Sequence, residues 1–325
     1  MDIQGKIKVI LDHIGSEITI DAKVKTNRDE CLVRIAGGHT DIYSIEKNGE
    51  VLFEKPRKMQ SEEESAVIHK YTLREFVAYI DSVDVKEIEF IREAFTMNME
   101  LLEEGLASEK TTFGPMLLKN NGGKMLSEDE VKTAQLLCNG AIEARVLGLD
   151  KPAMSITGSG AHGIIATLPL FAYQQIHQTE VSEDKLLRAT ALSYLITMYI
   201  KEYSGKLSAF CGCGIAAGTG MAWGLCYLKG GNISDMERVI CNMASGITGM
   251  ICDGGNQGCT MKGIVAVDAA FRAVDMALSG VSVAPEHGIN GKTPEETMRN
   301  MGRIASPGMI ETEKTIVEIM QGKRW

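Results

Sequence analysis

The sequence predicts an α+β protein in which a small antiparallel β meander at the N-terminus is followed by a mainly α-helical domain. Two observations lead to this prediction: period-two alternation of apolar residues ends near residue 54, and helix-start signals recur after Pro56. Of 325 residues, 44% are hydrophobic and 24% charged, which is typical of a globular chain with a substantial core. We therefore predict a β-rich segment over 1–58, the remainder of a larger α/β domain, and a helical domain over 59–325.

Four short alternating segments form the predicted meander. They span residues 17–25, 31–35, 42–45 and 51–54. Turn residues separate them, and Asn48-Gly49 is the clearest pair, because a type I′ hairpin turn needs positive φ at both central positions. Sequential strands with such short links pair as antiparallel neighbours.

Helix-start signals mark the remainder of the chain. A Ser or Thr followed three residues later by Glu can form a capping box, in which each side chain bonds the other residue's backbone N–H. The five pairs are Ser61/Glu64, Thr72/Glu75, Ser127/Glu130, Ser234/Glu237 and Thr293/Glu296, the last with Pro294 at the first helical position. Five such pairs predict a mainly helical region.

Residues 207–228 contain no charged side chain in 22 positions. That length could cross a bilayer, and the spacings Gly214-x-x-x-Gly218 and Gly220-x-x-x-Gly224 occur between packed membrane helices. However, its Ser, Gly and Cys residues make the segment only mildly hydrophobic, and closely packed helices in a soluble core use the same glycines. We therefore predict a buried segment rich in small residues, and no membrane partner.

Charge limits the classes of partner. The chain has 34 Lys and Arg against 43 Asp and Glu, a net charge of -9, without a basic block. This balance argues against a nucleic-acid-binding surface and leaves a small anionic or zwitterionic metabolite as the expected ligand. The opening Met1–Gly5 begins no secretory signal segment, so we expect a cytoplasmic protein.

Six of the eight cysteines lie between Cys211 and Cys259, within glycine-rich runs. Thiolates bind iron or zinc, and glycines let backbone N–H groups approach cluster sulfides. No CxxC pair is present and no His lies between His177 and His287, which makes zinc the weaker choice. An iron-sulfur cluster on three thiolates would leave one iron open to a substrate. Cysteines that merely pack a glycine-rich core, or dithiol chemistry at Cys211 and Cys213, are the alternatives.

A glycine-rich loop precedes a predicted helix at Thr157–Gly163. It fits G-x-G-x-x-G literally, but the preceding segment is too weak a strand for a dinucleotide-binding unit. The alternative is a group of backbone N–H donors at a helix start, suited to a carboxylate. We assign Gly158, Ser159 and Gly160 to substrate binding on this basis.

Gly37-Gly38-His39-Thr40-Asp41 links the second and third predicted strands. The two glycines would let His39 and Thr40 project into a cleft, where His39 could move a proton near neutral pH. A solvated turn histidine is the alternative. The spacing leaves both open.

Together these residues resemble the iron-sulfur L-cysteine desulfidases, which are related to the alpha chain of bacterial L-serine dehydratase. The resemblance runs in family order over nearly the whole chain. The matching stretches are Gly37–Ile42 with Ile45-Glu46, Gly158–Pro169, Leu207–Cys211 and Met250–Lys262.

The resemblance implies a [4Fe-4S] cluster held by Cys211, Cys252 and Cys259, with Cys213 as an alternative to Cys211 because its Cys-Gly-Ile context is similar to that of the serine dehydratase branch. It also implies a lyase of amino-acid catabolism. Sulfide would leave L-cysteine, or water would leave L-serine, and the aminoacrylate product would hydrolyse to pyruvate and ammonia. His39 would be the catalytic base, and Thr40 and Asn256 would contact substrate. The cysteines expected only to pack are Cys31, Cys138, Cys226 and Cys241.

The chain departs from the full-length desulfidases, which carry a further N-terminal region with a Gly-Cys-Thr-Glu-Pro motif. We therefore expect a homodimer, or a complex with a second chain that supplies this region. A different class of function remains as an alternative: a non-catalytic metabolite-binding or assembly subunit without a cluster.

Overall fold

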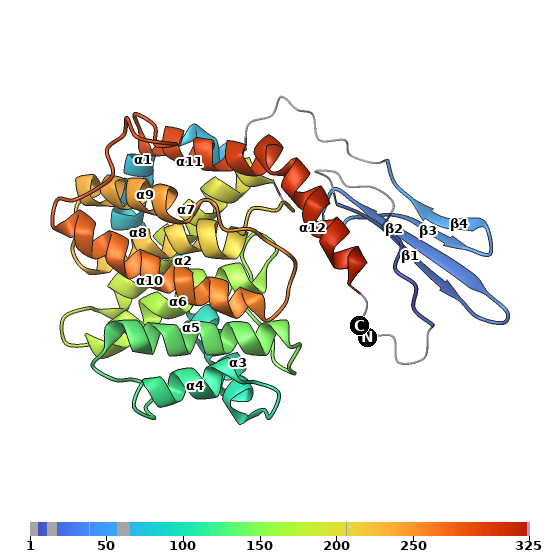
Figure 1. Ribbon diagram of the computed structural model, residues 1–325, viewed down its shortest axis with the longest axis horizontal. Helices are drawn as coiled ribbons and strands as arrows, with labels where there is room; N and C mark the ends of the chain where they lie inside the picture. Colours follow the sequence, from blue (N-terminus) through green and yellow to red (C-terminus); the bar gives the residue numbers. More distant parts are fainter. Residues whose placement is uncertain (1–5, 12–17, 39, 57–65, 206, 324–325) are drawn as a thin grey trace. The chain divides into compact units, whose positions relative to one another are not determined.

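The computed structural model describes residues 6–11, 18–38, 40–56, 66–205 and 207–323 (Figure 1). The chain divides into two compact units. The first contains Met1–Glu64 and Ile310–Trp325, and the second contains Ser65–Met309. The first unit therefore joins the N-terminal segment to the last helix, α12 (Ile310–Gly322).

The first unit contains a four-stranded antiparallel sheet in the order β1-β2-β3-β4 (Figure 1). The strands are β1 Thr19–Lys25, β2 Glu30–Ala36, β3 Ile42–Lys47 and β4 Glu50–Glu54. Asn48 and Gly49 join β3 to β4 with φ of 52° and 84°, so the predicted hairpin turn with two left-handed residues is confirmed. The predicted meander is confirmed with it.

Helices make up the second unit, which confirms the predicted fold class. The α-helices are α1 Leu73–Ser82, α2 Val85–Ile88, α3 Arg92–Ala107, α4 Phe113–Asn120, α5 Glu130–Val146, α6 Gly160–Ile176, α7 Glu183–Ser204, α8 Gly218–Leu228, α9 Ile233–Ile247, α10 Gly258–Leu278 and α11 Pro294–Arg303. Shorter helical turns are η1 Val67–Lys70, η2 Glu89–Ile91, η3 Gly212–Ala217 and η4 Ile304–Gly308.

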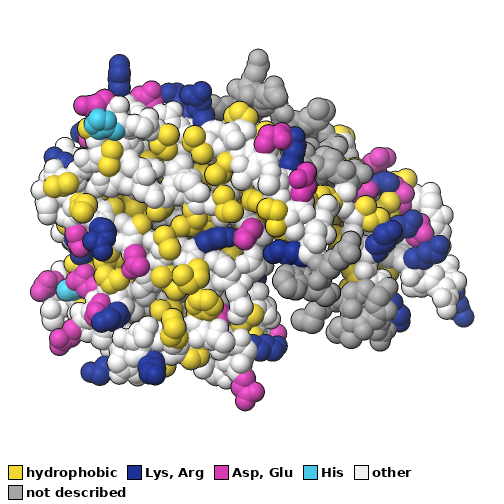
Figure 2. Space-filling view, viewed as in Figure 1, with side chains coloured by type: hydrophobic (Ala, Val, Ile, Leu, Met, Phe, Trp, Pro, Cys, Tyr) yellow, Lys and Arg dark blue, Asp and Glu magenta, His cyan; other side chains and the backbone are white. Residues whose placement is uncertain are grey.

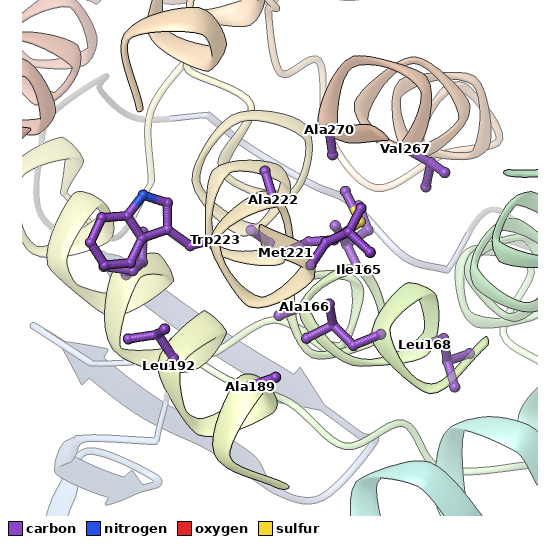
Figure 3. Packing of buried hydrophobic residues seen from close by; sticks show 14 of the residues in the cluster. Ile165, Ala166, Leu168, Ala189, Leu192, Met221, Ala222, Trp223, Val267 and Ala270 are labelled. Atoms are coloured by element: carbon purple, nitrogen blue, oxygen red, sulfur yellow. The ribbon is translucent and has the colours of Figure 1, made fainter. Parts of the chain in front are cut away.

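Helix α8 lies at the centre of the second unit. Its Met221, Ala222 and Trp223 have no exposed surface and pack among side chains of α6, α7 and α10 (Figure 3). A Cβ on Gly224 would lie 2.8 Å from a carbonyl oxygen of α7, so this glycine permits the close approach of the two helices. The predicted buried segment is confirmed, and none of the described helices is long and apolar enough to cross a membrane.

Two of the predicted helix starts are confirmed. Thr72 and Glu75 form a complete capping box at α1. Thr293 caps α11 by accepting from the backbone N–H of Glu296, with Pro294 at the first helical position. Each cap satisfies a backbone donor that has no partner within its helix.

Two other predicted helix starts are wrong. Helix α5 is capped by Asp129 instead of Ser127, and α9 is capped by Asn232 instead of Ser234. All four residues are good N-caps, and the one chosen depends on where tertiary packing ends the helix. The remaining pair, at 61 and 64, lies outside the described residues.

Acidic and basic side chains are interspersed over the face of the second unit that Figure 2 presents. The Lys and Arg side chains on this face alternate with Asp and Glu, and apolar side chains lie between them. This face therefore presents no continuous field of positive charge, the feature by which proteins attract a phosphate backbone.

Candidate functional site

A short β-bridge brings two of the predicted ligand cysteines together across forty residues of sequence. Phe210 pairs with Ile251, and the backbone N–H groups of Cys211 and Cys252 donate across the bridge at 3.0 and 2.6 Å. The bridge aligns the start of η3 with the loop that precedes α10. Cys211 and Cys252 are therefore neighbours because of backbone hydrogen bonds and not because of sequence proximity.

Three of the thiols interact at this point. Cys211 Sγ is 3.3 Å from Cys213 Sγ, and Cys213 also interacts with the thiol of Cys259, which lies in the first turn of α10. The backbone N–H of Gly214 donates to Cys211 Sγ at 3.5 Å. A Cβ at this glycine would collide with Sδ of Met250, so the Met250 side chain packs directly over the backbone here.

These contacts give the three thiols different pKa values. The hydrogen bond from Cys213 lowers the pKa of Cys211 and lowers the pKa of Cys259 to about 6. The same hydrogen bonds raise the pKa of Cys213 well above its usual range. Burial raises the pKa of Cys252. Cys213 is thus the thiol that holds its proton most firmly among the three that interact.

Two lysines approach the cysteines. Lys262 pairs with Asp253 on the loop before α10 and interacts electrostatically with Cys211 and Cys252. Lys201, near the end of α7, is 7% exposed and interacts electrostatically with the same two sulfur atoms and with Cys213. Burial lowers the pKa of Lys201, and the thiols act in the opposite direction. Neither lysine was a predicted site residue, although Lys262 follows Cys259 by three residues and so shares its helix face.

The predicted substrate loop is a tight turn followed by a helix N-terminus. Thr157 and Gly158 both have positive φ, 51° and 78°, and Ile156 and Ser159 exchange backbone hydrogen bonds across the turn. Ser159 caps α6. No strand precedes the loop apart from this isolated bridge, so the geometry required for dinucleotide binding is not formed by the described residues.

A positive charge lies beside the same loop. A Cβ on Gly160 would be 2.9 Å from Nε of Arg145, so the guanidinium lies directly against the first residue of α6. Arg145 is exposed. The first N–H groups of a helix have no partners within it, and its N-terminus carries partial positive charge. The loop, the helix start and Arg145 together favour an anionic group.

His162 joins the glycine loop to the cysteine segment. Its Nδ1 lies 2.6 Å from Thr157 Oγ1, and that hydroxyl donates its own proton to the carbonyl of Ile156. Nδ1 must therefore donate, which leaves Nε2 as the unprotonated nitrogen. Nε2 lies against Gly212, the residue between Cys211 and Cys213. A Cβ atom added to Gly212 would lie 2.6 Å from this nitrogen. His162 lies within the glycine-rich stretch Thr157–Gly163, but no pattern in the sequence indicated that it would contact the cysteine segment.

The buried imidazole predicts a pH dependence of stability. Burial, and then the charge of Lys201, lowers the pKa of His162 from 6.5 to about 3. The unfolded chain takes up this proton below pH 6.5 and the folded chain does not, so stability is complete above pH 6.5 and is lost as the pH falls towards 3. From pH 7 to pH 5 we expect a loss of about 2 kcal/mol.

Urea denaturation at pH 7 and pH 5 measures this loss. His162→Gln should remove that part of the difference, whereas His287→Gln, at an exposed histidine, should retain it. Equal pH dependence in the two variants would contradict the prediction.

Asn256 folds back onto its own loop. Its Oδ1 accepts from the backbone N–H of Gly258 at 2.7 Å, and its Nδ2 lies 3.3 Å from the carbonyl of Gly254. These contacts hold the loop that carries Cys252 and Asp253. A direct contact between Asn256 and substrate stays a prediction.

The predicted catalytic base, His39, lies outside the described residues. Thr40 is exposed in the turn between β2 and β3, and it belongs to the first unit, whereas the cysteines and the glycine loop belong to the second. The roles assigned to His39 and Thr40 stay predictions.

The other cysteines are free thiols. Cys138, Cys226 and Cys241 are buried, and Cys31 is partly buried in β2. Burial raises the pKa of Cys138 and Cys241, and that of Cys226 to about 12. These surroundings suit thiols that pack as small apolar groups.

No group of three or more His, Cys, Asp or Glu side chains among the described residues surrounds a single metal position. A [4Fe-4S] cluster makes a different demand, since its cysteine ligands bind different iron atoms and need not converge on one point. A cavity of about 410 Å³ in the second unit is lined by other residues, including His69, Tyr199 and Arg299. The cysteine site is thus defined by its thiols and not by a large cavity.

Comparison with known proteins identifies the family of the chain. The family model described as serine dehydratase alpha chain matches residues 20–318. A UPF0597 protein of Clostridium botulinum is 42% identical over 97% of this chain and 76% of its own length. UPF0597 proteins of Caldanaerobacter subterraneus and Clostridioides difficile are 37% and 35% identical, and the chain covers 74% and 72% of them. The chain therefore spans about three quarters of the length of these relatives.

Proposed function

Because this chain belongs to the serine dehydratase alpha-chain family, we propose that it is an iron-sulfur-dependent amino-acid lyase, or the cluster-bearing subunit of one. The proposed reaction removes sulfide from L-cysteine or water from L-serine and yields pyruvate and ammonia. One observation carries the proposal: two segments distant in sequence, with Cys211 and Cys213 on one and Cys252 and Cys259 on the other, are joined by backbone and thiol contacts, beside two lysines.

The donor set suits an iron-sulfur cluster better than it suits a single ion. Cys211, Cys252 and Cys259 are the proposed ligands, and Cys213 is the alternative to Cys211. Three thiolates leave one iron without a protein thiolate, and when bound such a centre supplies a Lewis acid to a substrate oxygen or sulfur. Backbone N–H groups in the glycine-rich runs, such as that of Gly214 at Cys211, stabilise the negative charge of thiolates.

The residues of the glycine loop would hold the substrate carboxylate. Ser159 caps α6, Gly160 begins it, and Arg145 lies beside Gly160 with a positive charge. An amino acid whose carboxylate is held at this N-terminus has a fixed orientation, which lowers the entropy lost when it reacts. In the proposal His39 accepts the α-proton, and Thr40 and Asn256 contact the substrate.

Anaerobic reconstitution tests this function. The full chain, loaded with iron and sulfide and freed of excess reagent, should retain about four irons per chain and become brown. The loaded protein should release pyruvate and sulfide from L-cysteine, or pyruvate and ammonia from L-serine. A colourless, air-stable protein that retains no iron would contradict the proposal and favour a non-catalytic binding subunit.

A further inference from the structure

Lys201 is a buried ammonium for which the described residues provide no carboxylate partner. It lies in the last turn of α7 and is 7% exposed, and its Nζ donates to the carbonyl of Gly205 at 2.7 Å. The carboxylate of the exposed neighbour Glu202 attracts the ammonium electrostatically. The described residues show no ion pair between the two side chains. A buried charge without a counter-charge is costly, so a group of opposite sign is expected nearby.

The groups near Lys201 that can carry the opposite charge are the cysteine sulfurs, which become negative when they are deprotonated as metal ligands. Its ammonium interacts electrostatically most strongly with Cys252, and less strongly with Cys213 and Cys211. The stem of the lysine lies against Gly212, since a Cβ there would be 3.1 Å from Lys201 Cδ. The absence of a side chain at Gly212 thus allows the lysine to lie against the segment that carries two of the cysteines.

Lys262 provides an internal contrast. It also interacts with Cys211 and Cys252, but its Nζ forms an ion pair with Asp253. That pair brings no net charge to the sulfur atoms. The net positive charge that the described residues place beside these cysteines is therefore that of Lys201.

We propose that Lys201 is the counter-charge of the centre held by the cysteines, a positioning residue whose ammonium stabilises the negative charge of the thiolates and of the cluster. This inference rests on the proposed function. The reduced state of a cluster carries one more negative charge than the oxidised state, so a nearby cation raises the reduction potential. The same attraction opposes the loss of iron from the thiolates.

A simpler role for Lys201 makes different predictions. A lysine near the end of a helix can hydrogen-bond a terminal carbonyl and interact with the helix dipole, and the contact with Gly205 has this form. Lys185, on the same helix, makes a similar contact, since its Nζ donates to the carbonyl of Leu228 at 2.8 Å. Lys185 is therefore a matched control for the structural role.

The test compares full-length chains reconstituted with iron and sulfide. Lys201→Gln keeps an N–H donor and removes the charge, Lys201→Arg keeps the charge, and Lys185→Gln is the control. Two readouts do not require turnover: the midpoint potential of the cluster, and the rate of iron loss to a chelator. We expect Lys201→Gln to have a lower potential and about tenfold faster iron loss, the scale by which groups next to metal ligands change metal affinity. Lys201→Arg and Lys185→Gln should match the wild type.

The outcomes separate the two proposals. A wild-type chain that retains no iron refutes the proposed function, and the counter-charge role with it. A wild-type cluster whose potential and iron loss are unchanged in Lys201→Gln refutes the counter-charge role alone, even where thermal stability falls. Should Lys201→Gln fail to fold, Lys201→Met, which preserves most of the apolar stem, is measured by the same two readouts.

Discussion

Replacement of Cys259 by alanine is expected to abolish iron retention. The wild-type chain should hold about four irons after anaerobic reconstitution, whereas Cys259→Ala and Cys252→Ala should hold none, because two thiolates do not retain a cluster that needs three. Cys259 lies in the first turn of α10, and its sulfur accepts a hydrogen bond from Cys213. Iron and sulfide analysis together with visible absorbance measures the effect.

Cys241→Ala is the matched control for these variants. Cys241 is a buried free thiol on α9 and should be dispensable for iron retention. The pair Cys211→Ala and Cys213→Ala then identifies the third ligand, and we expect the first to lose the cluster and the second to retain it. A full cluster in Cys259→Ala would contradict the proposed ligand set.

Removal of the Glu143 carboxylate should destabilise the second unit by about 4 kcal/mol. Glu143 lies on α5 with no exposed surface. One of its oxygens accepts from the backbone N–H groups of Thr112 and Phe113 at 2.8 and 3.1 Å, and the other from that of Gly114 at 2.8 Å. Glu143→Ala leaves these donors at the start of α4 without their acceptor, and buried unpaired donors are costly.

Glu75→Ala is the control for Glu143→Ala. The Glu75 carboxylate also serves a helix start, since it accepts from the backbone N–H of Thr72 at 2.7 Å, but this contact is exposed to solvent. Water can replace it, so the expected loss is much smaller than that of Glu143→Ala. Free energies of unfolding from urea denaturation compare the two variants. Equal losses would show that burial adds nothing to the contact of Glu143.

The sheet was predictable because its determinants are local. Alternation of side chains has the period of a strand, and Asn48-Gly49 adopts the two positive φ values that join β3 to β4. Neither feature depends on distant residues. The helix starts were less predictable, because Asp129 and Asn232 compete with nearby serines and tertiary packing decides between them.

The site was predictable in its chemistry and not in its geometry. Cysteines among glycines indicated a thiolate centre, and comparison with known proteins confirms the serine dehydratase alpha-chain family. Nothing in the sequence placed His162 of α6 against Gly212, or Lys201 of α7 within electrostatic reach of Cys252. These contacts join residues about fifty positions apart, and they exist because α6, α7, α8 and α10 share one core.

The sequence by itself therefore determined the fold class, the family and which thiols are candidates for the cluster. Those properties follow from local periodicity and from residue types at fixed spacings. Only the tertiary structure decided that Cys213 interacts with both Cys211 and Cys259, and that the buried Lys201 lies against Gly212, between two of these cysteines. The physical reason is that the sign and strength of a charge contact depend on burial and distance, which side-chain packing sets and sequence spacing does not.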